Sequence, residues 1–196
     1  MRFAEYVRQN AEEVVGTFPA DRGIYAVTFR LDSIDQDPRH PYLAIGYTTE
    51  ADAAEAAGQT PDAWEARWSY AYFPPTGLEG VRAIGQDGQG AQAFRREALA
   101  QGLWYEDGDE PGERDEELCE WFYEVCVKAA RPLHDSGRIV AALGRPLPVL
   151  LYDMFEPDAM FALTSAANPA ELVAEFMTED PEREDDGEHG TGEPLP

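Results

Sequence analysis

The sequence is poor in cysteine, in basic residues and in long apolar runs, and each shortage excludes a class of protein. Its two cysteines cannot supply the disulfide framework of a small secreted domain, so we expect a reducing compartment. No stretch approaches the roughly 18 apolar residues that a membrane-spanning helix needs. Residues 1–6 lack the apolar region of a signal peptide, and together these features predict a cytoplasmic protein.

The shortage of basic residues restricts the partners. Fifteen Lys and Arg face 39 Asp and Glu, which gives a formal net charge of −24. Such a chain repels phosphate backbones and anionic membranes, so we expect neither nucleic acid nor a membrane as a partner. It would attract a basic protein and speed its encounter with that protein. The alternative is that the acidity serves solubility alone.

Charge and apolar content divide the chain into one domain and a tail. Residues 179–196 hold eight carboxylates and one Arg, a net charge of −7, and we expect them to form a disordered acidic tail. Residues 1–178 then carry −17. An apolar fraction of 43%, with 4 Trp, 9 Tyr and 9 Phe, supplies a core, so residues 1–178 are predicted to be a single globular domain.

The apolar spacing predicts a mixture of helices and strands. Helices are expected over residues 3–15, 50–57, 91–104, 118–130, 139–143 and 170–177, the last with Asn168 as its N-cap. Strands are expected over residues 24–31, 42–47, 68–72, 147–153 and 161–164. Because strands and helices do not alternate regularly, we predict an α+β fold: a mixed, mainly antiparallel sheet of about four to five strands with helices packed on it.

The most distinctive cluster is the aromatic segment, residues 64–73. Its alternating aromatic side chains are typical of one face of a strand. Aromatic side chains are enriched both in cores and at the energetic centres of interfaces. Two interpretations therefore remain open: packing in the core, or a partly exposed recognition surface. The interface candidates in this segment are Trp64, Arg67, Trp68, Tyr70 and Tyr72.

A second candidate surface is the acidic loop, residues 106–117, which is rich in carboxylates, Gly and Pro. Its interface candidates are Asp107, Asp109 and Glu110. The spacing from Asp107 does not fit a calcium-binding EF-hand loop, since position five is Pro111 and position twelve is Leu118. We expect a solvated loop and no metal.

No motif for catalysis or for a cofactor stands out. Cys119 and Cys126 are seven residues apart on one predicted helix, a rise of about 10 Å, which is too far for a disulfide. The best single candidate for acid–base chemistry is Asp153, which ends a buried strand. The alternative is that Asp153 binds loop amides there. We therefore predict no catalytic residues and no cofactor, and keep as a second hypothesis a small carboxylate-dependent hydrolase or transferase near Asp153 and Arg67.

Several short stretches, taken in order, suggest a family resemblance. They are IYAVTF (24–29), YTTE (47–50), RWS (67–69), VLLYD (149–153) and SAANP (165–169). Over residues 3–177 the chain resembles an uncharacterised bacterial family, the domain-of-unknown-function family 4303. The resemblance implies no activity and no catalytic residues.

Our leading hypothesis is a non-enzymatic, acidic protein-binding domain whose partner is a basic protein. A candidate role, by analogy with other small acidic bacterial proteins, is that of an immunity or inhibitor protein for a basic bacterial toxin. The sequence predicts no oligomeric state.

Overall fold

A mixed sheet organises the molecule in the computed structural model, which describes residues 1–80, 82–84 and 88–180. Strand β1 (Ile24–Ser33) pairs antiparallel with β2 (Pro41–Thr49) and parallel with β4 (Val149–Asp153). A short segment, β3 (Arg82–Ile84), lies antiparallel to the outer side of β2, so the order is β3-β2-β1-β4. The α+β class is confirmed.

The sheet is smaller than predicted. Only three of its strands have five or more residues, and β3 contributes three residues at one edge. The parallel pairing of β1 with β4 makes the sheet open and mixed. Of the about four to five strands expected, two are absent, because residues 68–72 and 161–164 belong to helical segments instead.

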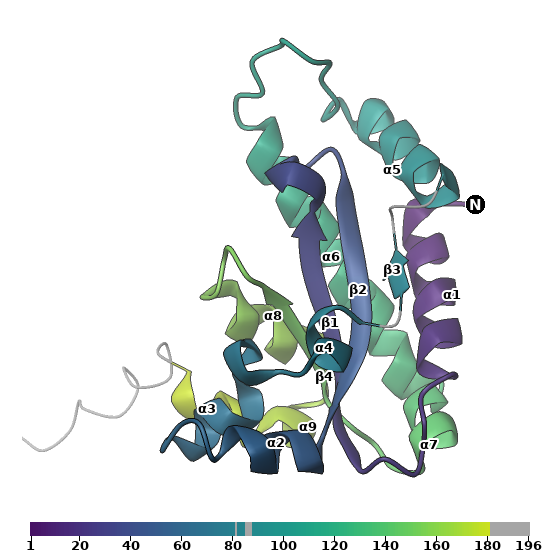
Figure 1. Cartoon of the computed structure of the whole chain (residues 1–196). Coiled ribbons are helices and arrows are strands. Elements are labelled where there is room, and N and C mark those ends of the chain that lie inside the picture. Colours follow the sequence, from purple (N-terminus) through teal and green to yellow (C-terminus); the bar gives the residue numbers. More distant parts are fainter. Residues whose placement is uncertain (81, 85–87, 181–196) are drawn as a thin grey trace, which may run out of the picture.

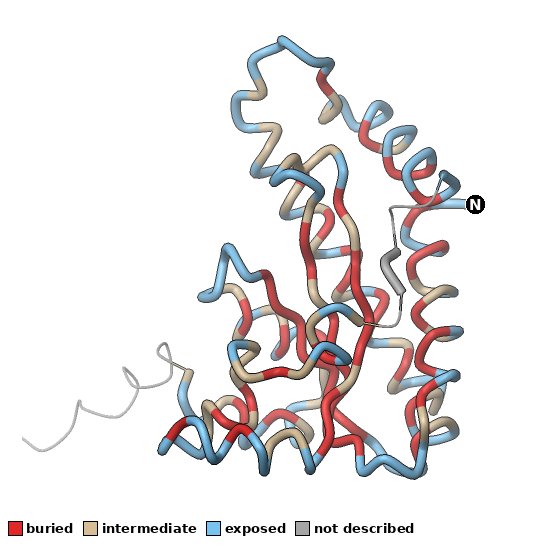
Figure 2. Tube along the Cα trace, viewed as in Figure 1, coloured by how far each residue is buried: buried red, intermediate tan, exposed pale blue. Residues whose placement is uncertain are grey.

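One face of the sheet is covered by the long helices (Figure 1). These are α1 (Phe3–Val15), α5 (Gly88–Gln101) and α6 (Arg114–Asp135), and the short helix α7 (Arg138–Leu143) packs against α1 and α6. Alternate side chains of β1, namely Val27, Phe29 and Leu31, enter the main hydrophobic core on this side and are fully buried. Figure 2 shows how completely the strands are enclosed.

Shorter elements cover the opposite face. They are α2 (Glu50–Ala56), α3 (Ala63–Trp68), the 3-10 turn η2 (Tyr70–Tyr72), α4 (Pro75–Leu78), α9 (Ala170–Val173) and the 3-10 turn η3 (Phe176–Glu179). Helix α8 (Ala159–Ala167) follows β4 and packs beside it and α6. The second, smaller core between these elements and the sheet contains Tyr25, Tyr152 and Phe176.

Residues 68–72 are helical because local capping outweighs their alternating pattern. The Asp62 carboxylate accepts hydrogen bonds from the amides of Trp64 and Glu65, which starts α3. The Ser69 hydroxyl accepts one from Ala71 and starts η2. Trp68 and Tyr72 are also four residues apart, which is one helical turn, so the pattern fits either structure.

Residues 161–164 lie in α8, where Thr164 connects the helix to the sheet. The Thr164 hydroxyl accepts a hydrogen bond from the Leu151 amide at 3.0 Å and donates one to the Leu151 carbonyl. Asn168 is not the N-cap that we expected. Its side chain bonds both backbone groups of Val149 and so fastens the end of α8 to β4.

Two further sequence predictions concern the ends of elements. Helix α1 spans the predicted residues. Helix α6 begins at Arg114, so residues 114–117 of the predicted acidic loop are helical, and it continues through Pro132 to Asp135. The tail predicted for residues 179–196 lies, apart from Glu179 and Asp180, outside the described residues. In the part of the chain that the structure describes, no helix combines the length and the apolar character needed to cross a membrane.

Candidate functional site

The aromatic segment mainly packs on the second face of the sheet. Trp68 is 4% exposed and meets the Tyr25 ring edge-on at 5.5 Å, with a further edge contact to Phe176. Phe73 is buried as well and packs edge-on against Tyr152. These rings fill the space between the sheet and its covering elements, so their first role is in the core.

Three aromatic side chains of this segment keep an accessible edge. Trp64 is half-buried, and its Nε1 donates a hydrogen bond of 2.8 Å to the Phe176 carbonyl. Tyr70 stacks on the buried Tyr152 ring with centroids 5.1 Å apart. Tyr72 is half-buried and borders a pocket between α2 and α4. The role of Trp64, Tyr70 and Tyr72 in contacts with a partner thus remains a prediction.

Arg67 joins three parts of the chain at the beginning of β1. Its guanidinium lies 4.2 Å from the centre of the Tyr25 ring and bonds both carboxylate oxygens of Glu50, at 2.8 and 3.1 Å. Glu175 approaches to 3.7 Å. The Glu50 carboxylate raises the pKa of Arg67 above its usual value, and the hydrogen bonds from Arg67 lower the pKa of Glu50. The charge of Arg67 is therefore already balanced within the protein.

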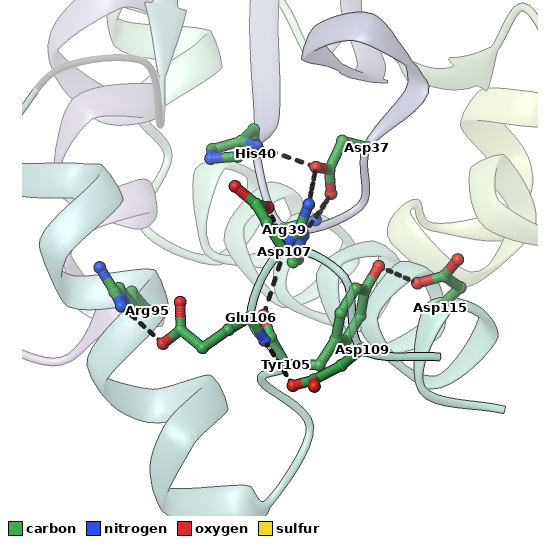
Figure 3. A network of polar contacts seen from close by, with 9 residues as sticks. All are labelled: Asp37, Arg39, His40, Arg95, Tyr105, Glu106, Asp107, Asp109 and Asp115. Carbon is green, nitrogen blue, oxygen red and sulfur yellow. Dashed lines mark hydrogen bonds and ion pairs between the residues drawn. The ribbon is translucent and has the colours of Figure 1, made fainter. Parts of the chain in front are cut away.

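The acidic loop is anchored at its base by an arginine and a tyrosine (Figure 3). Arg39 bonds Asp107 at 2.8 Å and Asp37 at 2.6 Å, and its guanidinium lies 4.6 Å from the Tyr105 ring centre. The buried Tyr105 donates a hydrogen bond to Asp115 on α6. Burial, together with this carboxylate, raises the pKa of Tyr105 to about 12. The loop is thus tied to the turn between β1 and β2 and to α6.

The three candidate residues of the loop differ in the freedom of their charges. The Asp107 side chain is 94% exposed but is paired with Arg39. Asp109 accepts a hydrogen bond of 3.2 Å from the Glu106 amide. The exposed Glu110 contributes its backbone carbonyl to a bond with Arg114. The loop therefore offers less unbalanced charge than its sequence suggests.

The two predicted surfaces do not meet. Figure 1 places the acidic loop at the top, between α5 and α6, and α3 with its aromatic neighbours near the bottom. Likewise Arg67 and Asp153 are separated. Arg67 packs on Tyr25, whereas Asp153 pairs with Leu31, six residues further along β1. Six strand residues span about 20 Å, so Arg67 and Asp153 cannot share one reaction centre.

Asp153 organises the carboxyl end of β4. Its side chain is inside the protein, where Oδ2 accepts a hydrogen bond of 2.8 Å from the Tyr123 hydroxyl on α6. Oδ1 accepts one of 2.7 Å from the Phe155 amide. Asp153 therefore binds a loop amide, which was the alternative to a role in acid–base chemistry. It holds the turn that follows the strand.

Asp32 has the same role at the end of β1. Its Oδ1 accepts a hydrogen bond of 2.7 Å from the Ser33 amide, and its Oδ2 accepts from Tyr42 and Arg30, at 2.9 and 2.5 Å. Because β1 and β4 are parallel neighbours, both turns leave the sheet at the same edge. Each buried aspartate (Asp32 or Asp153) thus fixes the loop that follows it.

These two loops expose apolar side chains, and we call Ile34, Met154 and Phe155 the strand-end surface. Their exposed fractions are 42%, 41% and 58%. Ile34 precedes Asp35 and Gln36, which both have positive φ, 54° and 59°. Left-handed conformations are costly for residues such as Gln and are concentrated at functional positions. The sequence signal was slight: an apolar pair directly after a strand that ends in Asp.

An acidic groove borders the strand-end surface. It has a volume of about 470 Å³ and lies between α6, the β1–β2 turn and the start of α8. Its carboxylates are Asp115, Glu116, Glu120 and Glu156. None of the described residues that line it is basic. The two loops that carry the strand-end surface thus also contribute to an acidic groove, through Gln36 and Glu156.

The chemistry of the groove does not favour nucleophilic catalysis. Burial and the nearby carboxylates of Asp153, Asp115 and Glu156 raise the pKa of the Cys119 thiol to about 11. Burial also raises the pKa of Cys126. Thiols with raised pKa values are poor nucleophiles. The cavity that reaches Asp153 has a volume of about 20 Å³, enough for one water molecule and too small for a substrate.

Metal-ligating side chains are also dispersed. Among the described residues, no three His, Cys, Asp or Glu side chains are grouped so that they could hold one ion. His40 lies beside Asp37 near the acidic loop, and His134 bonds Asn168 at the end of α6.

Comparisons with known proteins identify no relative of this chain. No protein-family model, no curated protein and no solved structure matches the chain. The resemblance to family 4303 therefore stays a prediction, and the function has to be argued from the chain itself.

Proposed function

We propose that this chain is a non-enzymatic binding domain for a basic protein, and that the strand-end surface with its acidic groove is the contact face. The observation that carries the proposal is that the loops after β1 and β4 expose three large apolar side chains and also line the acidic groove, through Gln36 and Glu156. Large apolar side chains on a rigid scaffold are typical of interface centres, and charges at the rim accelerate encounter.

The construction of the surface supports this proposal. Ile34 and Phe155 follow strands that are buried in the sheet. Asp153 fixes the loop after β4 through the Phe155 amide, and backbone hydrogen bonds of Ile34 with His40 and Asp37 hold the turn after β1. Binding therefore requires little ordering of the loops, which reduces its entropic cost. A groove lined by carboxylates favours Lys or Arg side chains from the partner.

A specific role that fits this chemistry is inhibition of a basic bacterial toxin. A toxin that acts on nucleic acid needs a cationic surface, and an acidic protein with an apolar anchor could cover it. In this role, Phe155 would insert into the partner while Glu116, Glu120 and Glu156 pair with its cations.

The alternative is a carboxylate-dependent hydrolase or transferase at Asp153. One observation favours it: Asp32 and Asp153 border the same small cavity at adjacent strand ends. Both carboxylates, however, are already bonded to a tyrosine hydroxyl and to a backbone amide. A hydrolytic activity of the purified chain that is lost in Asp153→Asn would favour this alternative.

A selection from a random peptide library tests the binding proposal without knowledge of the partner. The immobilised wild-type chain is expected to enrich peptides that combine Lys or Arg with an aromatic or aliphatic residue. Binding of these peptides should fall at least about tenfold in Phe155→Asp, which adds a charge where an apolar contact is expected.

Leu99 provides the matched control. It lies on α5, is 54% exposed against 58% for Phe155, and is outside the strand-end surface. The Leu99→Asp variant should bind the selected peptides as the wild type does. If Phe155→Asp and Leu99→Asp bind equally well, or if the selection enriches no basic residues, the proposal fails.

A further inference from the structure

A second groove lies between α6 and α8 and differs in character from the acidic one. It has a volume of about 520 Å³. Its floor is apolar, formed by Tyr123 and Val127 of α6 with Leu163 and Ala166 of α8. Val127 and Leu163 are only partly buried. This face therefore has an apolar stripe that nothing in the chain covers within the described residues.

The charges along this groove are balanced, in contrast to the rest of the molecule. Two acidic residues, Glu120 and Glu124, border its first half, and two basic residues, Lys128 and Arg131, border its second half. Lys128 is the only lysine in the sequence. In a chain with a net charge of −24, a face with no net charge is exceptional.

The order of these charges is self-complementary. If two copies of α6 cross antiparallel, Glu120 meets Arg131 of the other copy and Glu124 meets Lys128 of the other copy. The midpoint between residues 120 and 131 is at about position 125.5 of the helix, and the midpoint between residues 124 and 128 is at position 126. At 1.5 Å of rise per residue, these two midpoints are less than 1 Å apart along the helix axis. One two-fold axis thus satisfies both pairs, and each pair is formed twice.

The apolar residues agree with the same axis. Tyr123 and Val127 have their midpoint at position 125, so each would face the other across the two-fold axis. We propose that the α6–α8 groove is the contact surface of a symmetric homodimer, with α6 of one copy seated in the groove of the other. None of Ile34, Met154 and Phe155 lines this groove, whereas Glu120 and Tyr123 line both grooves, so the dimer contact and the partner contact meet at these two residues.

Charge complementarity selects a second copy over other occupants. Glu124 and Lys128 are each 65% exposed and bond each other at 2.6 Å within the helix, so both remain available for a shared network. A basic partner would meet Lys128 and Arg131, and an acidic one would meet Glu120 and Glu124. Only a sequence with the reverse order of charges fits the whole groove, and an antiparallel copy of α6 has that order.

Sedimentation equilibrium of the full chain tests the proposal through two single substitutions. Lys128→Glu makes all positions of the Glu124/Lys128 pairs acidic, and Glu124→Lys makes them all basic. Each variant alone should weaken dimerisation at least about tenfold through like-charge repulsion. An equimolar mixture of the two variants should recover the dimer, because every pair then joins opposite charges again.

Glu171→Lys is the control, since Glu171 is exposed on α9 and does not line the groove. It changes net charge as much as Glu124→Lys does and should leave the dimer intact. Circular dichroism of each variant verifies the fold. A wild-type monomer at all concentrations, a dimer that ignores both substitutions, or a mixture that stays monomeric would each overturn the proposal.

Discussion

The aromatic segment and the strand-end surface are both apolar, yet the fold uses them in opposite ways. Trp68 is 4% exposed, whereas Phe155 is 58% exposed. The aromatic segment has the denser cluster in the sequence, but the sheet and η3 cover most of it. The strand-end surface has only three large apolar residues, and the turns hold them outward.

The difference teaches that an aromatic cluster in the sequence does not by itself mark an interface. Aromatic density shows that a core needs filling as often as it shows a contact surface. Exposure depends on which elements meet, and Ile34 and Phe155 are exposed because two parallel strands end at one edge. The following predictions test whether the two regions differ as stated.

The largest expected effect is on stability. Replacing Trp68 by Ala should lower the free energy of unfolding by about 3–5 kcal/mol, because it removes a buried ring that contacts Tyr25 and Phe176. Phe155→Ala should change it by less than about 0.5 kcal/mol. Urea denaturation of both variants measures the difference. Equal losses in the two variants would show that the regions are not distinct.

An alkaline titration should expose the burial around Tyr25. Burial raises the pKa of Tyr25 to about 12 from a usual value near 10. The folded protein therefore favours the neutral phenol, and this contribution is fully present below pH 10 and is lost as the pH rises through 12. Unfolding measured across this range should show stability falling by roughly 2–3 kcal/mol from Tyr25. In Tyr25→Phe the decline should be shallower.

A smaller loss is expected at the support of the strand-end surface. Tyr123→Phe removes the hydroxyl that donates to Asp153 and should cost about 1–3 kcal/mol, because the acceptor is a buried carboxylate. Tyr72→Phe is the matched control in the aromatic segment and should cost less than about 0.5 kcal/mol. Chemical denaturation compares them. An unaffected Tyr123→Phe variant would mean that this hydrogen bond does not hold the β4 turn.

The last prediction concerns the reactivity of a cysteine and involves no change in stability. With a pKa of about 11, Cys119 should alkylate roughly 100-fold more slowly at pH 8 than an unperturbed thiol, since the thiolate is the nucleophile. Mass spectrometry of the native chain after a timed pulse measures the rate, and the unfolded chain supplies the reference. Rapid labelling of native Cys119 would contradict the acidic, shielded environment assigned to the groove.

Part of the fold could be predicted from local patterns. Helix α1 was predicted correctly and the strands β1 and β2 were predicted close to their observed bounds, because their apolar spacing and turn residues act over short distances. Helices α2 and α7 were also predicted close to their observed bounds. The position of Asp153 at the end of a buried strand was also predicted correctly from the local pattern.

The remainder depended on contacts distant in sequence. The parallel pairing of β1 with β4 joins residues more than a hundred positions apart, and no local pattern specifies it. The strand-end surface follows from that pairing, so the sequence could not bring the loops after β1 and β4 to the same end of the sheet. Residues 161–164 were assigned to a strand because a short apolar run fits either structure until Thr164 meets Leu151.

The most direct test of the central claim is to map a basic peptide from the selection onto the isotope-labelled chain by nuclear magnetic resonance. We predict that amide shift changes concentrate at residues 34–36, 116–120 and 154–158. Changes concentrated in the aromatic segment, or in the acidic loop around Asp107 and Glu110, would contradict the account and restore the surfaces that the sequence had favoured.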